Sequence, residues 1–196
     1  MNKTKIAIFA SGGGSNARKI LEYFQDSETA EVALVVSNKK DAGVLDIADT
    51  FSVPTHLINR QSFYETTEIL EVLKAHDIGF IALAGFLWLV PAYLVKAYPG
   101  KILNIHPALL PKYGGKGMYG HHVHEAVKAA GELESGPTIH FVNEHYDEGD
   151  IVFQATCSLE PEDEPEDIAR KVLSLEHAHF PRIIEAVIIK QKVRNN

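Results

Sequence analysis

The sequence is poor in cysteine and in basic residues. Cys157 is the single cysteine among 196 residues, which excludes an intramolecular disulfide and a cysteine-rich zinc site. One cysteine is also typical of a protein from a reducing compartment. Lysines and arginines number 19 against 26 acidic residues, and the formal net charge is −7. A surface of that sign repels nucleic acid and anionic membranes, so we expect small-molecule partners and no nucleic acid.

Long apolar runs are missing as well. The longest run, residues 80–95, contains Gly85 and Pro91 and falls short of the roughly 20 residues that a membrane-spanning helix needs. The apolar stretch at residues 6–10 is too short for the core of a signal peptide and leads directly into a glycine turn. We therefore expect a cytoplasmic protein with no membrane partner, acting as a monomer or a homodimer.

The first half of the chain alternates short apolar runs with longer amphipathic segments. The predicted strands are residues 5–10, 31–38, 54–58, 78–85 and 101–106. The predicted helices are residues 15–26, 42–51 and 62–77, with a short segment at 91–98. Strands that are apolar throughout indicate a parallel sheet buried on both faces. The alternation predicts an α/β fold with a doubly wound, mostly parallel sheet and helices on both faces.

The second half has a different pattern. A helix is predicted at residues 121–131, strands at 136–143 and 150–159, and a long terminal helix at 165–191. The two strands flank the turn "EHYDEG", which predicts an antiparallel hairpin in the C-terminal half. No repeat, linker or low-complexity segment interrupts the chain. We therefore expect a single domain over residues 1–196, with a core at about 5–190.

A glycine-rich turn, "SGGGSN" (11–16), joins the first predicted strand to the first predicted helix. The free N–H groups at such a helix start can hold an anion. The Lys-Ser/Thr pair of a nucleotide-binding P-loop is absent, and no acidic residue closes the second strand, as a dinucleotide site requires. We interpret Gly14, Ser15 and Asn16 as a site for a monophosphate or similar anion. The simpler alternative is a tight turn capped by Ser15.

Two polar side chains lie at the end of the buried strand 101–106. Asn104 and His106 are two residues apart and project from the same face, at the sheet edge where open α/β proteins bind ligands. An amide N–H can bind an oxygen that gains negative charge, and an imidazole can deliver a proton near neutral pH. Asp147, in the turn between the later strands, is a candidate carboxylate partner. The chain has no recognisable nucleophile motif, which favours direct transfer between two bound substrates.

These residues belong to longer motifs that are similar to a known family. "NIHPALLPKY" (104–113) resembles the signature of formyltransferases that use 10-formyltetrahydrofolate. The stretches "SGGGSN", "LAGF", "HFV", "DEGDIV" and "EH" are also similar and occur in the same order, over residues 6 to about 188. The resemblance is greatest to the branch that formylates the glycinamide amine of N1-(5-phosphoribosyl)glycinamide in de novo purine biosynthesis.

The resemblance implies a role for each matching residue. Asn104 would bind the formyl oxygen, His106 would be the general acid, and Asp147 would raise the pKa of that histidine and help a water to shuttle protons. Gly14, Ser15 and Asn16 would hold the phosphate of the ribotide, and Glu176 its ribose hydroxyls. The expected co-substrate is 10-formyltetrahydrofolate, with no metal.

The folate site implied by the resemblance is built mainly from one segment. The expected folate-binding residues are Leu87, Trp88, Leu89, Val90, Asn104, Val142 and, by a looser match, Arg60. Trp88 stands at a position where many relatives carry a basic residue. Leu173 stands at a position that is polar in some of them. The loop 112–121 is longer and richer in glycine and histidine than is common, and its Lys116, Tyr119 and His121 are candidate ribotide contacts.

Several alternatives remain open from the sequence. A formyltetrahydrofolate deformylase would be expected to carry an additional N-terminal domain, and a methionyl-tRNA formyltransferase an additional C-terminal domain with a basic surface. A non-catalytic phosphate-binding module would bind ligand without turnover. A dinucleotide-dependent oxidoreductase is disfavoured, because the acidic residue that it requires after the second strand is absent. His121, His122 and His124 suggest a metal site, but a half-exposed helix start is the simpler interpretation, because no H-E-x-x-H motif is present.

Overall fold

The computed structural model describes residues 3–194 and contains a seven-stranded sheet in the order β3-β2-β1-β4-β5-β7-β8. The parallel strands are β1 (Thr4–Ala10), β2 (Ala30–Ser37), β3 (Thr55–Leu57), β4 (Ile78–Leu83) and β5 (Ile102–His106). β7 (Thr138–Phe141) pairs antiparallel with β5, and β8 (Ile151–Gln154) pairs antiparallel with β7. The mostly parallel sheet and the C-terminal hairpin are therefore both confirmed.

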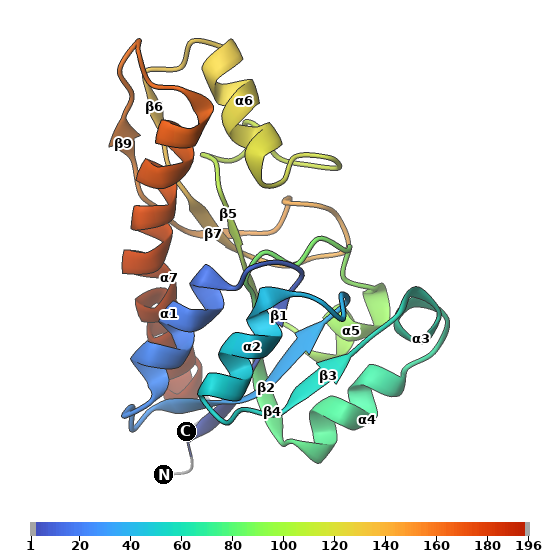
Figure 1. The fold of residues 1–196 in the computed structure, drawn as a ribbon. Coiled ribbons are helices and arrows are strands. Elements are labelled where there is room, and N and C mark those ends of the chain that lie inside the picture. Colours follow the sequence, from blue (N-terminus) through green and yellow to red (C-terminus); the bar gives the residue numbers. More distant parts are fainter. Residues whose placement is uncertain (1–2, 195–196) are drawn as a thin grey trace.

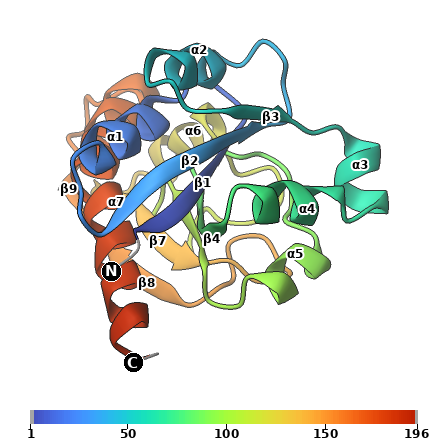
Figure 2. The same cartoon turned by 90° about the horizontal axis from the view of Figure 1, so that it is seen from below.

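Helices cover both faces of this sheet, as Figure 2 shows. Along β1, Ile6 and Ile8 belong to a core cluster that they share with the first two helices and the last helix. Ala7 and Phe9 belong to the core cluster on the opposite face of the sheet. The helices on the first face are α1 (Ser15–Phe24), α2 (Gly43–Thr50) and α7 (Pro165–Arg194). Those on the second face are α3 (Arg60–Glu65), α4 (Glu68–Ala75) and α5 (Ala92–Ala97). Alternate burial along an apolar strand explains the doubly wound arrangement.

The predicted helix at 62–77 is wrong in one respect, because the structure divides it into α3 and α4. Thr66 lies at the break, where its hydroxyl donates to the Ser62 carbonyl and accepts from the Glu68 N–H. Side-chain hydrogen bonds of this kind compete with the helical backbone pattern and end the helix. Asn59 and Ser62 form a capping box that moves the start of α3 to Arg60.

The predicted strand at 150–159 is also divided. After β8 the chain leaves the main sheet, and β9 (Cys157–Ser158) pairs with β6 (Glu134–Ser135) in a separate two-stranded sheet. The cause is a close approach: a Cβ on Gly136 would lie 1.8 Å from the Ala155 carbonyl oxygen. Cys157 is partly buried and packs against a small third cluster.

α6 (His121–Ala129) and the N-terminal part of α7 pack together at one end of the molecule, beyond the ends of the parallel strands (Figure 1). Their shared cluster is formed by Val127, Leu159, Ile168 and Val172. The C-terminal part of α7 extends along the first face of the sheet as far as Arg194. None of the helices within residues 3–194 is long and apolar enough to cross a membrane. The arrangement places the loop before α6 over the carboxyl edge of the sheet.

Gly14 and Gly13 allow a paired test of the turn between β1 and α1. Gly14 has φ of 78°, and a Cβ there would lie 2.8 Å from Val44 Cα, whereas a Cβ on Gly13 would meet nothing within 4 Å. We expect Gly14→Ala to lower the free energy of unfolding by about 2 kcal/mol, from backbone strain and the clash. Gly13→Ala should stay within about 0.5 kcal/mol of wild type. Urea unfolding measures both, and equal stabilities would contradict this packing.

Candidate active site

A cleft of about 700 Å³ opens at the carboxyl edge of the parallel strands. Its walls come from the ends of β4 and β5, the loop before α6, the turn before β8, and the facing sides of α1 and α7. The lining residues that matter below are Asn16, Leu87, Asn104, His106, Lys116, Tyr119, His121, His124, Asp147, Leu173 and Glu176. The predicted catalytic residues therefore share one cleft with Asn16 and Glu176, although they are far apart in the sequence.

His106 is the last residue of β5 and is only 4% exposed. Its Nε2 lies 2.7 Å from the Tyr113 carbonyl oxygen, and its Nδ1 lies 3.5 Å from Asp147 Oδ2. Because a carbonyl only accepts, Nε2 carries a hydrogen and donates it to Tyr113. The Nδ1 atom then faces the Asp147 carboxylate at a distance too long for a strong hydrogen bond. Nδ1 carries a hydrogen only when the ring is protonated, and a group entering the cleft can then compete with Asp147 for it.

The pKa of His106 lies below its ordinary value. Burial lowers it most, while the Asp147 charge and the hydrogen bond to Tyr113 act in the opposite direction. Asp147 thus has the upward influence that the resemblance implies, but desolvation outweighs it in the free protein. A substrate that brings negative charge into the cleft would move the balance toward the protonated ring.

Asp147 is held in the turn between β7 and β8 with φ of 56°, in the left-handed region. Its Oδ2 accepts from the Gly115 N–H at 2.9 Å, and its Oδ1 lies 3.4 Å from Asn104 Nδ2. Burial acts to raise the pKa of Asp147, but the neighbouring His140 and His106 rings and the Gly115 N–H outweigh it and hold the pKa below its ordinary value. Asp147 is therefore ionised at neutral pH.

His140 is part of this group, and the sequence interpretation did not assign it a role. It pairs with Asn104 across β5 and β7, with its Nε2 3.1 Å from Asn104 Nδ2. Its Nδ1 lies 2.8 Å from the Phe141 carbonyl oxygen, so Nδ1 donates and Nε2 accepts from the amide. The amide hydrogens of Asn104 thus point at His140 and Asp147, and the longer contact to Asp147 is the one that an entering oxygen can replace.

Asn16 and Glu176 form a second polar pair in the cleft. Asn16 Nδ2 donates to Glu176 Oε2 at 2.5 Å, while Asn16 Oδ1 is buried without a hydrogen-bond partner. Burial raises the pKa of Glu176 to about 7, although the Asn16 hydrogen bond acts to lower it. Gly14 is the N-cap of α1 and no side chain caps this helix, so Ser15 is not the cap of the simpler alternative. The N–H groups of this helix start stay available for an anion.

The predicted folate residues lie less close together than the catalytic ones. Leu87 lines the cleft, and its N–H donates to Ser11 Oγ at 3.0 Å. Val90 is buried in the second core cluster, and Trp88 and Leu89 are partly buried. Arg60 lies over the Trp88 ring, 5.2 Å from its centroid. Arg60 thus places a cation against the face of Trp88.

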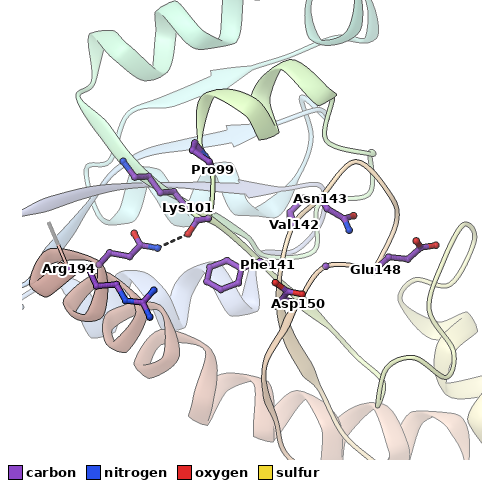
Figure 3. Close-up of a pocket in the computed structure, with 11 residues that line it drawn as sticks. Pro99, Lys101, Phe141, Val142, Asn143, Glu148, Asp150 and Arg194 are labelled. Carbon is purple, nitrogen blue, oxygen red and sulfur yellow. Dashed lines mark hydrogen bonds between the residues drawn. The ribbon is translucent and has the colours of Figure 1, made fainter.

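Val142 lines a different hollow of about 590 Å³, on the outer side of the loop 142–150 (Figure 3). Lys101 and Arg194 lie at one end of this hollow and Glu148 and Asp150 at the other. Gln191 closes part of it through a hydrogen bond to the Gly100 carbonyl. The hollow contains none of the predicted catalytic residues, so we place the chemistry in the first cleft.

The three histidines at the start of α6 differ in their surroundings. His121 and His122 are exposed and contact Glu125, and His121 also lies 3.7 Å from Glu166. His124 is buried in the cleft wall, and burial lowers its pKa to about 4. Within residues 3–194 no group of three or more histidine, cysteine or acidic side chains is arranged to hold a metal ion.

Comparison with known proteins agrees with this arrangement. A family profile described as "Formyl transferase" matches residues 4–184. The chain therefore belongs to the formyl transferase family, and its fold is that of a formyl-group transferase.

Its relatives carry a more specific name. A chloroplastic phosphoribosylglycinamide formyltransferase from Arabidopsis thaliana is 44% identical over 94% of this chain and 65% of its own length. The phosphoribosylglycinamide formyltransferase of Bacillus subtilis is 35% identical over 94% of both chains. The chain thus spans less than two thirds of the plant relative and nearly all of the bacterial one.

Solved structures give the same result. Phosphoribosylglycinamide formyltransferase from Anaplasma phagocytophilum superposes with a TM-score of 0.86 at 31% identity, over 95% of this chain and 87% of its own. Glycinamide ribonucleotide transformylase 1 from Geobacillus kaustophilus superposes with a TM-score of 0.86 at 32% identity, over 95% of this chain and all of its own. The doubly wound fold is therefore shared over nearly the whole chain.

Thr138 offers a test of the loop that follows His106. Its buried hydroxyl donates to the Ala108 carbonyl and accepts from the Leu110 N–H and from Gln154. Thr138→Val should lower the free energy of unfolding by about 2–3 kcal/mol, because it leaves these polar groups buried and unpaired. Thr138→Ser keeps the hydroxyl and should cost about 1 kcal/mol for the lost methyl group. Urea unfolding compares them, and a valine variant as stable as the serine variant would contradict the assignment.

The raised pKa of Glu176 predicts a dependence of stability on pH. With a folded-state pKa of about 7 against an ordinary value of 4.5, the folded state binds the proton more tightly than the unfolded state. Stability is therefore lost as pH rises from about 4.5 to 7. Glu176→Gln should be more stable than wild type at pH 8, by at most about 3 kcal/mol, and the difference should shrink toward pH 5.

Chemical denaturation at a series of pH values measures this difference. Glu166→Gln, on the exposed side of the same helix, is the matched control and should show a much smaller trend, because its contact with His121 is exposed to solvent. A Glu176→Gln variant whose advantage is the same at pH 5 and pH 8 would show that the carboxyl is not the cause.

Proposed function

We propose that this protein transfers the formyl group of 10-formyltetrahydrofolate to the glycinamide amine of N1-(5-phosphoribosyl)glycinamide, in de novo purine biosynthesis. The observation that carries the proposal is the placement of Asn104, His106 and Asp147 in one cleft with Asn16 and Glu176. The cleft thus combines groups for proton transfer with a helix start suited to a phosphate. Family membership and the names of the relatives support this reaction rather than another use of the same groups.

The proposed reaction joins two bound substrates directly. The amine nitrogen attacks the formyl carbon, a C–N bond forms, and the carbonyl oxygen becomes negatively charged. Asn104 donates an amide hydrogen to that oxygen in place of its long contact to Asp147, and His106 presents its Nδ1 proton. The bond from the formyl carbon to the folate nitrogen then breaks, and a proton passes from the amine to that nitrogen. Asp147 remains ionised and stabilises the protonated His106.

The substrates are assigned to the two ends of the cleft. We propose that Gly14, Ser15 and Asn16 hold the ribotide phosphate, and that Glu176 binds its ribose hydroxyls. Binding of a hydroxyl would provide a donor for the Asn16 Oδ1 atom, which is buried without a partner. The folate would enter the cleft at Leu87 and extend beyond it toward Trp88, Leu89, Val90 and Val142, with Arg60 beside Trp88.

The remaining proposals follow from composition and length. We propose a single domain, small-molecule substrates, no metal, no nucleic acid and no membrane partner, with the protein acting as a monomer or homodimer. A cytoplasmic location is consistent with the bacterial relative, while the plant relatives are named as chloroplastic.

Mixing the purified protein with both substrates and following release of tetrahydrofolate tests this function. Release that requires the ribotide is the expected result. Release without the ribotide would indicate a hydrolase of formyltetrahydrofolate instead. Failure to release tetrahydrofolate, in a protein that binds the ribotide, would reduce the function to binding.

His106→Ala tests the assigned general acid. We expect the rate of transfer to fall by roughly 10²–10⁴-fold, the usual contribution of a positioned acid–base group, because no other donor replaces the Nδ1 proton. Ribotide binding, measured by calorimetry, should be nearly unchanged, because the ribotide is assigned to α1 and Glu176. His122→Ala removes an exposed histidine and is the control. Strong residual transfer by His106→Ala would remove His106 from the mechanism.

A further inference from the structure

Glu132, which follows α6, lies outside the cleft but contacts the segment that leads away from His106. Its Oε1 accepts from the Tyr113 hydroxyl at 2.8 Å and from Lys112 Nζ at 2.8 Å. Both partners belong to adjacent residues, so one carboxylate oxygen holds two consecutive side chains of the same segment. These contacts lower the pKa of Glu132, the Lys112 contact most and the Tyr113 contact next, so the carboxylate is ionised at neutral pH.

The backbone of Tyr113 needs such support. Its φ is 55°, in the left-handed region that L-residues with large side chains rarely adopt. This conformation directs the Tyr113 carbonyl oxygen at His106 Nε2, 2.7 Å away. A strained backbone position persists only where its surroundings hold it. The Tyr113 ring packs against the cluster of Val127, Leu159, Ile168 and Val172, and its hydroxyl binds Glu132.

We propose that Glu132 is a positioning residue for His106, acting through Tyr113, and this proposal rests on the proposed function. Glu132 anchors the Tyr113 side chain, the anchored residue keeps its left-handed backbone, and its carbonyl keeps the hydrogen of His106 on Nε2. The Nδ1 atom is then the one that gains and loses a proton inside the cleft, facing Asp147. Glu132 touches no reacting atom, because it lines a separate hollow behind the loop and not the cleft.

The protonation of His106 reports on this contact. The titratable groups that act on the ring are Asp147, which favours its protonated form, and His140, which disfavours it. His124 also lies in this cleft wall, and its own pKa is lowered partly by His106. The bond from Nε2 to the Tyr113 carbonyl also favours the protonated form. If the carbonyl moves away, the pKa of His106 falls further. A general acid must be protonated to act, so activity is then lost at a lower pH than in wild type.

Glu132→Ala is the principal variant, and the chain provides two matched comparisons. Glu132→Gln keeps an oxygen that can accept from the Tyr113 hydroxyl. Glu134→Ala removes an acidic side chain two residues away that lines the same hollow and makes no hydrogen bond to Tyr113. Tyr113→Phe removes the hydroxyl alone and keeps the ring. Kinetic constants for formyl transfer are measured across pH for each variant, together with the melting temperature.

We expect Glu132→Ala to lower kcat about tenfold at neutral pH, a part of the roughly 10²–10⁴-fold that a positioned acid–base group contributes. KM for both substrates should stay unchanged, and the pH at which kcat declines should move to a lower value. Tyr113→Phe should change kcat in the same direction, and Glu132→Gln and Glu134→Ala should remain close to wild type. Equal losses in Glu132→Ala and Glu134→Ala, or an unmoved pH profile, would overturn the proposal.

Nitrogen-15 chemical shifts of the His106 ring give a readout that does not require turnover. Wild type should show the neutral ring with its hydrogen on Nε2, and Glu132→Ala should show a mixture of the two neutral forms. If Glu132→Ala shows the same neutral ring form as wild type, the positioning role is contradicted, whatever reaction the protein catalyses. A changed ring form in a protein without formyl transfer would keep the contact and reject the proposed function.

Discussion

Four groups from three segments of the chain meet at the Asp147 carboxylate, and the candidate active site depends on these contacts. The amide of Gly115 and the side chain of Asn104 approach its two oxygens, and the rings of His106 and His140 lie within 3.6 Å. A buried carboxylate is unfavourable unless charges and donors surround it. The donors from Gly115 and Asn104 therefore offset the burial of Asp147, and the turn that carries it brings the hairpin of β7 and β8 to the end of β5.

The same cleft holds two buried carboxylates whose pKa values are shifted in opposite directions. Asp147 has several donors and neighbouring rings, and its pKa falls. Glu176 accepts a hydrogen bond from the Asn16 amide, but burial outweighs it and raises the pKa of Glu176 to about 7. One carboxylate is thus a fixed negative charge beside the proton donor, and the other can exchange a proton near neutrality. Carboxylates with different environments in one cleft are suited to different tasks.

The sequence predicted the fold well where local patterns determine it. The apolar run of β1 and the stripe of α1 depend on neighbours within the same segment, and both were found near their observed bounds. The break at Thr66 and the division of β8 from β9 depend on side-chain bonds and on the approach of Gly136 to Ala155, which no periodicity reveals. Such contacts join residues whose partners only the folded chain identifies.

The residues of the candidate site divide in the same way, into those that local spacing indicated and those that only the folded structure identified. The spacing of Asn104 and His106 at a strand end, together with the family motifs, indicated the residues that line the cleft. His140 and Glu132 were missed, because their importance lies in pairing across strands and in a contact 19 residues away. "HFV" was visible as a motif, but its histidine had no partner until β7 was placed beside β5. The lowered pKa of His106 likewise could be found only from the folded structure, because burial is its main cause.

The ionised Asp147 is proposed to control protonation of the buried His106. Nitrogen-15 NMR of the His106 ring through a pH titration, in wild type and in Asp147→Asn, is the decisive measurement. We expect a wild-type pKa below the ordinary value for histidine and a still lower pKa in Asp147→Asn, because the favourable charge is lost while burial remains. If the pKa of His106 stays the same or rises in Asp147→Asn, Asp147 does not control protonation of this ring.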